Sequence, residues 1–300
     1  MKQNTIIRFF VAVVAFAVLA SCNDWTEMET VEQKVTKPWE QNPELWAQYT
    51  TALRDYKQSE HFIVYARLHN SPEQAVSEQN YMRCLPDSLD IVALTNADNF
   101  SAFDAEDMPV MHEKGTKVLY QVDYAGRKAE LTDLAAYLEK VIAAVAANGM
   151  DGYSFTADPF DTAATAQIAA KLSAAKKEGQ LLVFEGNPLS LAAEDRARVD
   201  YVVLDTEKTE HATDVRLQVL NALNYAGIAP EHLLLAAEMN APLFDEERVE
   251  YAAIEEMARR VIEFGPLAGL ATYNIGEDYY HSKMNYETIS MAIQTLNPSK

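Results

Sequence analysis

Residues 131–158, LTDLAAYLEKVIAAVAANGMDGYSFTAD, contain one complete helix-to-strand unit and decide the fold. The first part repeats apolar side chains three and four residues apart, as on one face of an α-helix: Leu131, Leu134, Leu138, Val141, Ile142 and Val145. Gly149 follows, where a helix can end in a left-handed cap, and residues 152–155 form a short run typical of a buried strand. This stretch therefore predicts a helix that leads into a buried strand.

The same alternation continues in both directions along the chain. Gly179, Gly227 and Gly265 mark further helix ends, and Asp161 occupies a helix N-cap position. Eight short apolar runs alternate with helical segments: Phe62–Leu68, Leu89–Leu94, Lys117–Val122, Gly152–Phe155, Leu181–Phe184, Tyr201–Leu204, His232–Ala236 and Leu270–Tyr273. The sequence predicts an α/β protein, a single-domain (β/α)8 TIM barrel over residues 44–300. An open doubly wound sheet is the alternative, although no glycine-rich phosphate loop follows the first run.

The first 43 residues differ from the rest. Residues 1–21 combine Lys2, Arg8, an apolar stretch and small residues before Cys22, which resembles a bacterial lipoprotein signal peptide. The resemblance implies cleavage before Cys22 and lipidation of Cys22, with residues 22–43 as a tether; an uncleaved anchor is the alternative. The acidic residues that follow Cys22 resemble the export signals of surface lipoproteins in Bacteroidetes. We therefore expect a protein anchored by lipid in the outer membrane, with its folded part at the cell surface.

Charge and spacing exclude several classes of function. The chain has 25 Lys and Arg against 45 Asp and Glu, a formal net charge of −20, and no cluster of cations, so we expect no nucleic-acid partner. Its six histidines lack the spacing of a metal site, and no G-x-S-x-G motif is present. We therefore expect no metal, no cofactor and no serine hydrolase of the lipase type.

A barrel indicates where a ligand binds, because sites form where the carboxyl ends of the strands meet. These ends carry carboxylates, amides and aromatic rings, which suit the hydroxyl groups and the apolar faces of sugars. The glycan-binding candidates are Asp158, Asp205, Glu238, Tyr273, Tyr124, Asn274 and Tyr280. Each also has a structural explanation, since a carboxylate at a strand end often caps the next helix and a tyrosine can belong to the core.

The fourth apolar run carries a family motif. Residues 150–158, MDGYSFTAD, resemble the strand motif D-G-x-D-x-D-x-E of glycoside hydrolase family 18, which contains chitinases and endo-β-N-acetylglucosaminidases. The likeness spans about residues 44–297, includes residues 271–279, and is to the lipoprotein branch of the family in Bacteroidetes. It implies a TIM barrel, a glycan that contains N-acetylglucosamine, and a reaction in which the substrate's own N-acetyl group is the nucleophile.

The chain departs from this motif at the positions that carry the chemistry. In the family the final Glu is the general acid and the Asp two residues before it orients the N-acetyl group; Asp158 and Thr156 stand there, and Ser154 replaces the first Asp. A neutral hydroxyl cannot stabilise the positive charge of the intermediate, and a carboxyl one methylene shorter is displaced by about 1 Å. Because residues two apart on a strand share a face, we expect these three side chains to converge at the barrel mouth.

The sequence therefore predicts a surface lipoprotein that binds N-acetylglucosamine-containing glycans and has lost most or all hydrolysis. Two alternatives remain open: an active endo-β-N-acetylglucosaminidase or chitinase with Asp158 as general acid, and a non-catalytic structural or partner-binding surface protein. The expected partners are the glycan, the membrane through the lipid on Cys22, and a polysaccharide-uptake complex.

Overall fold

The computed structural model describes residues 37–74 and 77–299. The predicted signal peptide, Cys22 and most of the predicted tether lie outside these residues. The chain divides into two compact units, Met1–Trp46 and Ala47–Lys300. A short helix, α2 (Pro38–Gln41), lies where the sequence predicts irregular tether, and Pro38 at its first position suits a helix start because proline has no N–H to leave unpaired. Residues 44–58 carry apolar side chains at helical spacing, and helix α3 (Pro43–Gln58) forms there.

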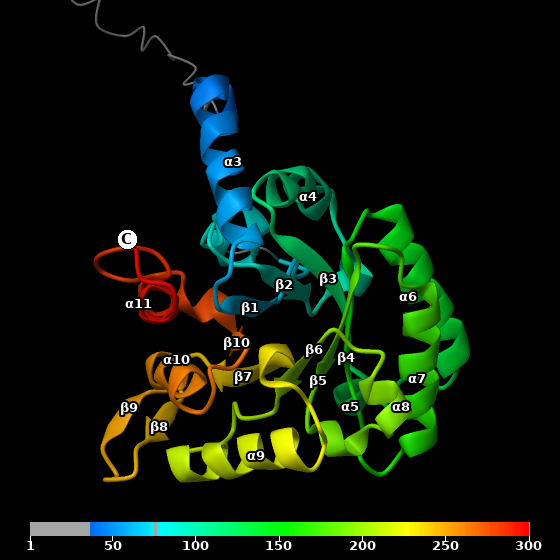
Figure 1. Cartoon of the computed structure of the whole chain (residues 1–300). Coiled ribbons are helices and arrows are strands. Elements are labelled where there is room, and N and C mark those ends of the chain that lie inside the picture. Colours follow the sequence, from blue (N-terminus) through cyan, green and yellow to red (C-terminus); the bar gives the residue numbers. More distant parts are fainter. Residues whose placement is uncertain (1–36, 75–76, 300) are drawn as a thin grey trace, which may run out of the picture. The chain divides into compact units, whose positions relative to one another are not determined.

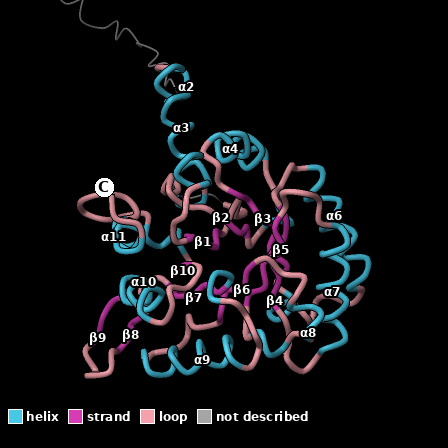
Figure 2. Tube along the Cα trace, viewed as in Figure 1, coloured by secondary structure: helices cyan, strands magenta, loops and turns pink. Residues whose placement is uncertain are grey.

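The second unit is built on a closed barrel of eight parallel strands, in the order β1-β10-β7-β6-β5-β4-β3-β2 (Figures 1 and 2). The strands are β1 (Ile63–Leu68), β2 (Ile91–Leu94), β3 (Lys117–Val122), β4 (Gly152–Thr156), β5 (Leu181–Glu185), β6 (Tyr201–Leu204), β7 (Leu233–Glu238) and β10 (Gly269–Tyr273). Each agrees within two residues with a predicted run. Strand β1 pairs with both β2 and β10, so the sheet has no edge, which confirms the barrel and excludes the open sheet.

Helices follow the strands around the outside of the barrel. They are α4 (Ala102–Glu113), α5 (Tyr124–Arg127), α6 (Leu134–Ala147), α7 (Thr162–Ala175), α8 (Ala193–Arg196), α9 (Ala212–Asn224), α10 (Ala253–Glu263) and α11 (Glu287–Leu296). One addition was not predicted: after β7 the chain forms an antiparallel hairpin, β8 (Pro242–Phe244) and β9 (Glu250–Ala252), before α10. Figure 1 shows this hairpin beside α10. Within the described residues, no helix combines the length and apolarity needed to cross a bilayer.

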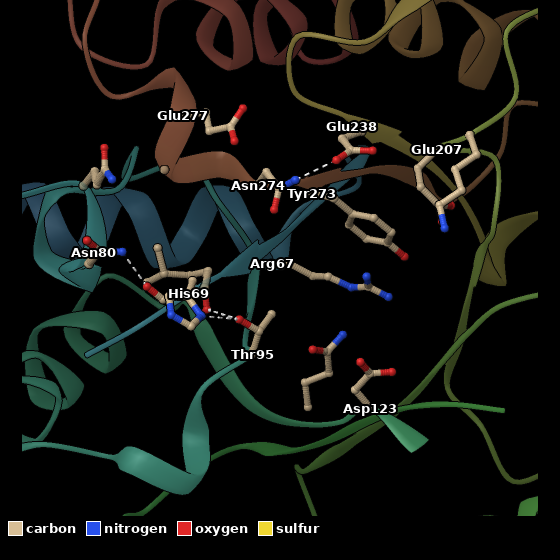
Figure 3. A pocket seen from close by; sticks show the side chains of 15 residues that line it. Arg67, His69, Asn80, Thr95, Asp123, Glu207, Glu238, Tyr273, Asn274 and Glu277 are labelled. Carbon is tan, nitrogen blue, oxygen red and sulfur yellow. Dashed lines mark hydrogen bonds between the residues drawn. The ribbon is translucent and has the colours of Figure 1, made fainter. Parts of the chain in front are cut away.

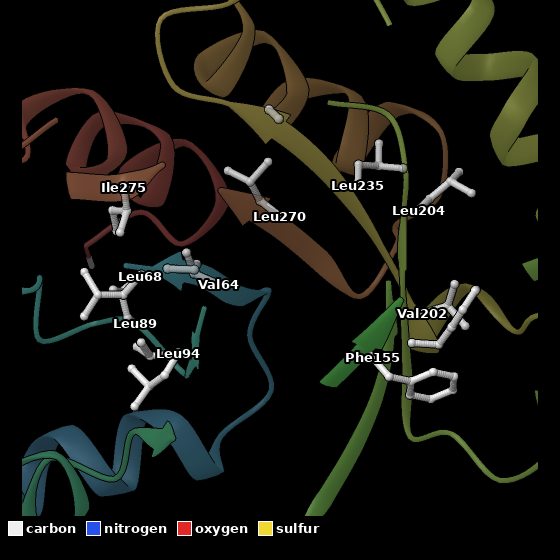
Figure 4. Packing of buried hydrophobic residues seen from close by; sticks show 14 of the residues in the cluster. Val64, Leu68, Leu89, Leu94, Phe155, Val202, Leu204, Leu235, Leu270 and Ile275 are labelled. Atoms are coloured by element: carbon white, nitrogen blue, oxygen red, sulfur yellow. The ribbon is translucent and has the colours of Figure 1, made fainter. Parts of the chain in front are cut away.

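Alternation along each strand separates two apolar clusters. Outward side chains such as Val64, Leu68 and Phe155 pack beneath the helices (Figure 4). Inward side chains, including Tyr65, Val183 and Leu234, fill the barrel itself. Large core side chains of this kind contribute about 2–5 kcal/mol each when truncation leaves a cavity. On β4 the outward position of Phe155 leaves its neighbours, Ser154 and Thr156, on the inward face, so the strand has the predicted register.

The same type of hydrogen bond joins neighbouring strands at three places at the amino-terminal end of the barrel. The residue just before β2, β4 and β6 is an aspartate, and its carboxylate accepts a hydrogen bond from a backbone N–H in the preceding strand. These three end aspartates and their donors are Asp90 with Val64 (2.8 Å), Asp151 with Val118 (2.9 Å) and Asp200 with Leu182 (2.7 Å). Each bond ties two neighbouring strands together at the place where the ladder begins.

Each end aspartate also has a basic neighbour. Asp90 pairs with His61 Nε2 at 2.9 Å, Asp200 with Lys176 Nζ at 2.8 Å, and Asp151 with both His112 and Lys117; the last two lie 3.0 and 3.3 Å away. Burial works to raise the pKa of Asp151, but the hydrogen bonds from His112 and Val118 lower it overall. Each carboxylate at this end thus has both a backbone donor and a basic partner.

Gly152, directly after Asp151, is required by the backbone. Its φ is +136°, a value that residues with a side chain rarely adopt, and a Cβ there would lie 2.0 Å from the carbonyl oxygen of Leu181. The Asp151-Gly152 pair, which is the part of the family motif that this chain retains, therefore serves the joint between β4 and its neighbours.

Candidate functional site

A pocket of about 480 Å³ opens at the carboxyl end of the barrel (Figure 3). Its lining comes from the ends of β1, β3, β7 and β10 and from the loops that follow the strands. The lining residues are Arg67, Leu68, His69, Gln79, Asn80, Thr95, Gln121, Asp123, Glu207, Lys208, Glu238, Tyr273, Asn274, Gly276 and Glu277. Most of these side chains are polar, and the volume lies within the range of small-molecule sites.

An ion pair forms the floor of this pocket. The guanidinium of Arg67, on β1, donates to the carboxylate of Glu185, the last residue of β5, which is 3% exposed. Glu185 also accepts from Tyr65 Oη, from Gln121 Nε2 at 3.1 Å and from Tyr273 Oη at 3.4 Å. Four side chains, from β1, β3 and β10, therefore donate to Glu185.

The two tyrosines of the floor, Tyr65 and Tyr273, belong to the same hydrogen-bond network around Glu185. The Arg67 guanidinium lies 3.5 Å from the centre of the Tyr273 ring, so it covers one face of that ring. Burial raises the pKa of Tyr65 and of Tyr273 well above the usual value, and the adjacent Glu185 charge adds to this effect. Burial works to lower the pKa of Arg67, but Glu185 reverses this and raises it. Both phenols and the guanidinium therefore stay protonated.

Two asparagines hold two glutamates at the rim. Asn274 follows β10 and donates from Nδ2 to Glu238 at the end of β7, at 2.7 Å. Asn240 follows β7 and donates from Nδ2 to Glu277 in the loop after β10, at 3.0 Å. Both asparagines have left-handed backbones, with φ of 57° and 64°, a conformation that asparagine tolerates better than most residues. The loops after β7 and β10 are thus joined by a reciprocal pair of bonds.

The degenerate motif positions Ser154 and Thr156 lie on the inward face of β4. Ser154 is fully buried next to the Tyr65 hydroxyl. Thr156 Oγ1 donates to Asp123 Oδ1 at 2.9 Å and accepts from the backbone N–H of Ala125, also at 2.9 Å. Thr156 thus orients Asp123, and Asp123 is the residue of this pair that lines the pocket.

Glu207 differs from the other acidic residues of the pocket. It lies three residues beyond the end of β6, and its Oε2 is inaccessible to solvent and has no hydrogen-bond partner among the described residues. Burial raises the pKa of Glu207, and the charges of Arg67 and Lys208 oppose this only in part. An unsatisfied carboxylate oxygen at the wall of a pocket is costly unless a ligand supplies a donor.

Asp158 does not line the pocket. Its carboxylate turns to Lys128, with Nζ 2.9 Å from Oδ2, and accepts the backbone N–H of Phe160 at 2.8 Å. The Lys128 contact and the Phe160 bond hold the pKa of Asp158 below its usual range. Of the three side chains expected to converge at the mouth, Ser154 and Thr156 face inward, but none of the three lines the pocket, and Asp158 lies beyond β4, which ends at Thr156.

The structure divides the other glycan-binding candidates into two groups. Glu238, Tyr273 and Asn274 line the pocket together. Tyr124, Asp205 and Tyr280 do not: Tyr124 is buried and donates to Asp161 at 2.9 Å, and the other two are exposed loop residues that are not part of the lining. The sequence places Arg67, Asp123, Glu185 and Glu277 at the carboxyl ends of predicted strands, but the glycan-binding candidates did not include them, and Glu207 was missed altogether. Strand alternation supports the inward placement of Arg67 and Glu185, which share the parity of Tyr65 and Val183.

No group of three or more His, Cys, Asp or Glu among the described residues is placed to hold a metal ion.

Comparison with known proteins adds a family relation. Residues 26–141 match the family model for glycoside hydrolase family 18, BT1044-like. A search of curated proteins gave no match. Among solved structures, a selenomethionine form of a Glu-to-Gln variant of BT1044 is 17% identical with a TM-score of 0.71, over 88% of this chain and 96% of that one.

Two further structures share the fold. The endo-β-N-acetylglucosaminidase of Cordyceps militaris is 17% identical with a TM-score of 0.63, over 84% of this chain and 96% of that one. YKL-39, solved in the presence of chitooligosaccharides, is 10% identical with a TM-score of 0.63, over 79% of this chain and all of that one. The chain is thus a (β/α)8 barrel that resembles glycoside hydrolase family 18, in sequence over residues 26–141 and in fold over the whole barrel.

Proposed function

We propose that this chain binds a glycan in the pocket at the barrel mouth and does not hydrolyse it. The observation that carries the proposal is the separation of two functions: the pocket retains converging carboxylates and amides, whereas Asp158, at the family's proton-donor position, lies outside the lining and is paired with Lys128. We further propose, from the sequence, that lipid on Cys22 anchors the protein in the outer membrane with the barrel at the cell surface.

The chemistry of the pocket suits a sugar. The carboxylates of Glu238 and Glu277 and the amides of Asn274 and Gln121 present acceptors and donors to one space, and each sugar hydroxyl can use both. The fold relation points to the same ligand class, since YKL-39 was solved with chitooligosaccharides. An N-acetylglucosamine-containing oligosaccharide is therefore the first ligand to test.

Three features argue against hydrolysis at the motif positions. A general acid must be protonated, and Lys128 keeps the pKa of Asp158 low, so this carboxyl is ionised at neutral pH. Thr156 carries no charge to oppose that of an oxazolinium-like intermediate. Glu185, in the floor, is bonded to Arg67 and is not part of the pocket lining.

One observation favours hydrolysis as a second candidate function. Glu207 lines the pocket, its pKa is raised by burial, and one of its oxygens has no partner among the described residues. These are properties of a general acid, so an active enzyme would use Glu207 and not Asp158.

The test measures binding and cleavage side by side. Calorimetry with tetra-N-acetylchitotetraose should show binding by the full chain, and chromatography of the same mixture should show no shorter sugar after prolonged incubation. Turnover that survives Asp158→Asn but disappears in Glu207→Gln would establish the second candidate. Turnover lost in Asp158→Asn would overturn our account of that residue, and no affinity for any glycan would favour a structural or partner-binding protein.

A further inference from the structure

The pocket at the mouth carries an excess of negative charge. Four carboxyl groups line it, those of Asp123, Glu207, Glu238 and Glu277, against three basic side chains, Arg67, Lys208 and His69. Arg67 is paired with Glu185 in the floor, although its charge also acts on Glu207. The acidic groups of the lining therefore outnumber the basic groups that are left to balance them.

These four carboxylates, which we call the pocket acids, are satisfied by neutral donors or by none. Amide groups donate to Glu238 and Glu277, and the Thr156 hydroxyl and the backbone N–H of Gly126, at 3.0 Å, donate to Asp123. None of the pocket acids forms an ion pair with a Lys, Arg or His of the described part of the chain. A neutral donor leaves the negative charge in place, so the charge remains available to a ligand.

Glu207 provides a second, independent observation. Its Oε2 is shielded from solvent and lacks a hydrogen-bond donor within the described residues. A carboxylate oxygen in this position gains most from a charged donor, because charge-assisted hydrogen bonds are about twice as strong as neutral ones. An ammonium group supplies three N–H donors and the compensating charge together.

We infer that the pocket selects glycans with free amino groups, such as the glucosamine units of deacetylated chitooligosaccharides, over fully N-acetylated and acidic glycans. This inference rests on the proposed function. The protonated amine of such a unit takes the place of the missing cation among the pocket acids. A uronic or sialic acid carboxylate meets repulsion from the same groups.

The experiment compares sugars of equal length on the full chain. Calorimetry at about pH 6, where the sugar amine is protonated, should show chitosan tetraose binding about tenfold more tightly than its fully N-acetylated counterpart. Tetragalacturonate should not bind. Added salt should weaken the amine-dependent part, because ions screen exposed charges.

Variants locate the effect within the pocket. Glu207→Gln, Glu238→Gln and Glu277→Gln should each weaken chitosan tetraose by about threefold to tenfold, and each should weaken it by a larger factor than it weakens the N-acetylated sugar. Glu178→Gln is the matched control, since Glu178 is an exposed carboxylate in the turn before β5, at the opposite end of the barrel. It should change neither.

The outcomes separate this inference from the proposed function. If the N-acetylated sugar binds as tightly as chitosan tetraose or more tightly, the preference for amines is wrong and glycan binding stands. If chitosan tetraose binds but all three pocket variants retain its full affinity, attraction to the overall charge of −20 explains the result and the inference fails. If no sugar binds, the proposed function itself is wrong.

Discussion

The two ends of the barrel use the same side chains in opposite ways. At the amino-terminal end, Asp90, Asp151 and Asp200 each accept a backbone N–H from the neighbouring strand and lie beside a basic group. At the mouth, Glu238 and Glu277 are held only by amides. Carboxylates of the first kind hold strands together, and those of the second kind keep their charge for a ligand. The difference agrees with the general division of barrels into a stabilising end and a functional end.

Glu185 is the exception that tests this division most severely, since it lies toward the mouth but is paired like an end aspartate. Glu185→Gln should lower the free energy of unfolding by about 3–5 kcal/mol, because it leaves the Arg67 charge without its partner. Urea unfolding followed by circular dichroism measures this loss. A loss below about 1 kcal/mol would show that the ion pair in the floor is not a structural element.

The next effect concerns the end aspartates themselves. Asp90→Asn keeps the shape of the side chain but removes the charge that both Val64 N–H and His61 contact. We expect a loss of about 1.5–3 kcal/mol in unfolding free energy, the usual contribution of a hydrogen bond to a charged group. Glu178→Gln serves as the control. Equal stability of the two variants would remove the basis for calling this end structural.

The contribution of the His61–Asp90 pair to the free energy of unfolding should also depend on pH. The hydrogen bond to Asp90 raises the pKa of His61 above its usual value, although burial opposes the shift. The stabilisation is therefore complete below about pH 6.5, the unfolded value, and is lost as pH rises through the raised folded value. His61→Gln should fall below the parent in stability most clearly between about pH 5 and 6.5, with the gap narrowing at higher pH. A gap that widens with pH would contradict this sign.

The smallest effect on stability is expected at the mouth. Glu238→Gln and Glu277→Gln should each change the free energy of unfolding by no more than about 0.5 kcal/mol, because both groups are partly exposed and a neutral amide can replace their bonds. Thermal unfolding without ligand measures this. A loss comparable to that in Asp90→Asn would mean that the two ends of the barrel do not differ.

Sequence reasoning could predict the fold because periodicity and glycine positions are local signals. Each of the eight strands follows from a short apolar run, and the helix over 134–147 follows from its stripe. The hairpin β8–β9 was missed, since its three-residue strands carry no alternation long enough to recognise.

The site was only half predictable. Glu238, Tyr273 and Asn274 are found together because strand ends meet at one place. The direction of Asp158 depends on Lys128, which lies 30 residues earlier in a different loop, and Glu207 reaches the pocket through the path of a loop. The retained Asp151-Gly152 belongs to the amino-terminal joint, so this half of the motif indicated the architecture and carried no information about chemistry.

At the rim, Asn240 donates a hydrogen bond to Glu277 and Asn274 donates one to Glu238. Each of these hydrogen bonds can be replaced by one from a ligand. A ligand donor that approaches either glutamate can displace an amide that then turns to solvent, while the left-handed backbones of both asparagines stay where they are. A ligand would then bind and leave the rim by exchanging hydrogen-bond partners one at a time, without a movement of the loops after β7 and β10.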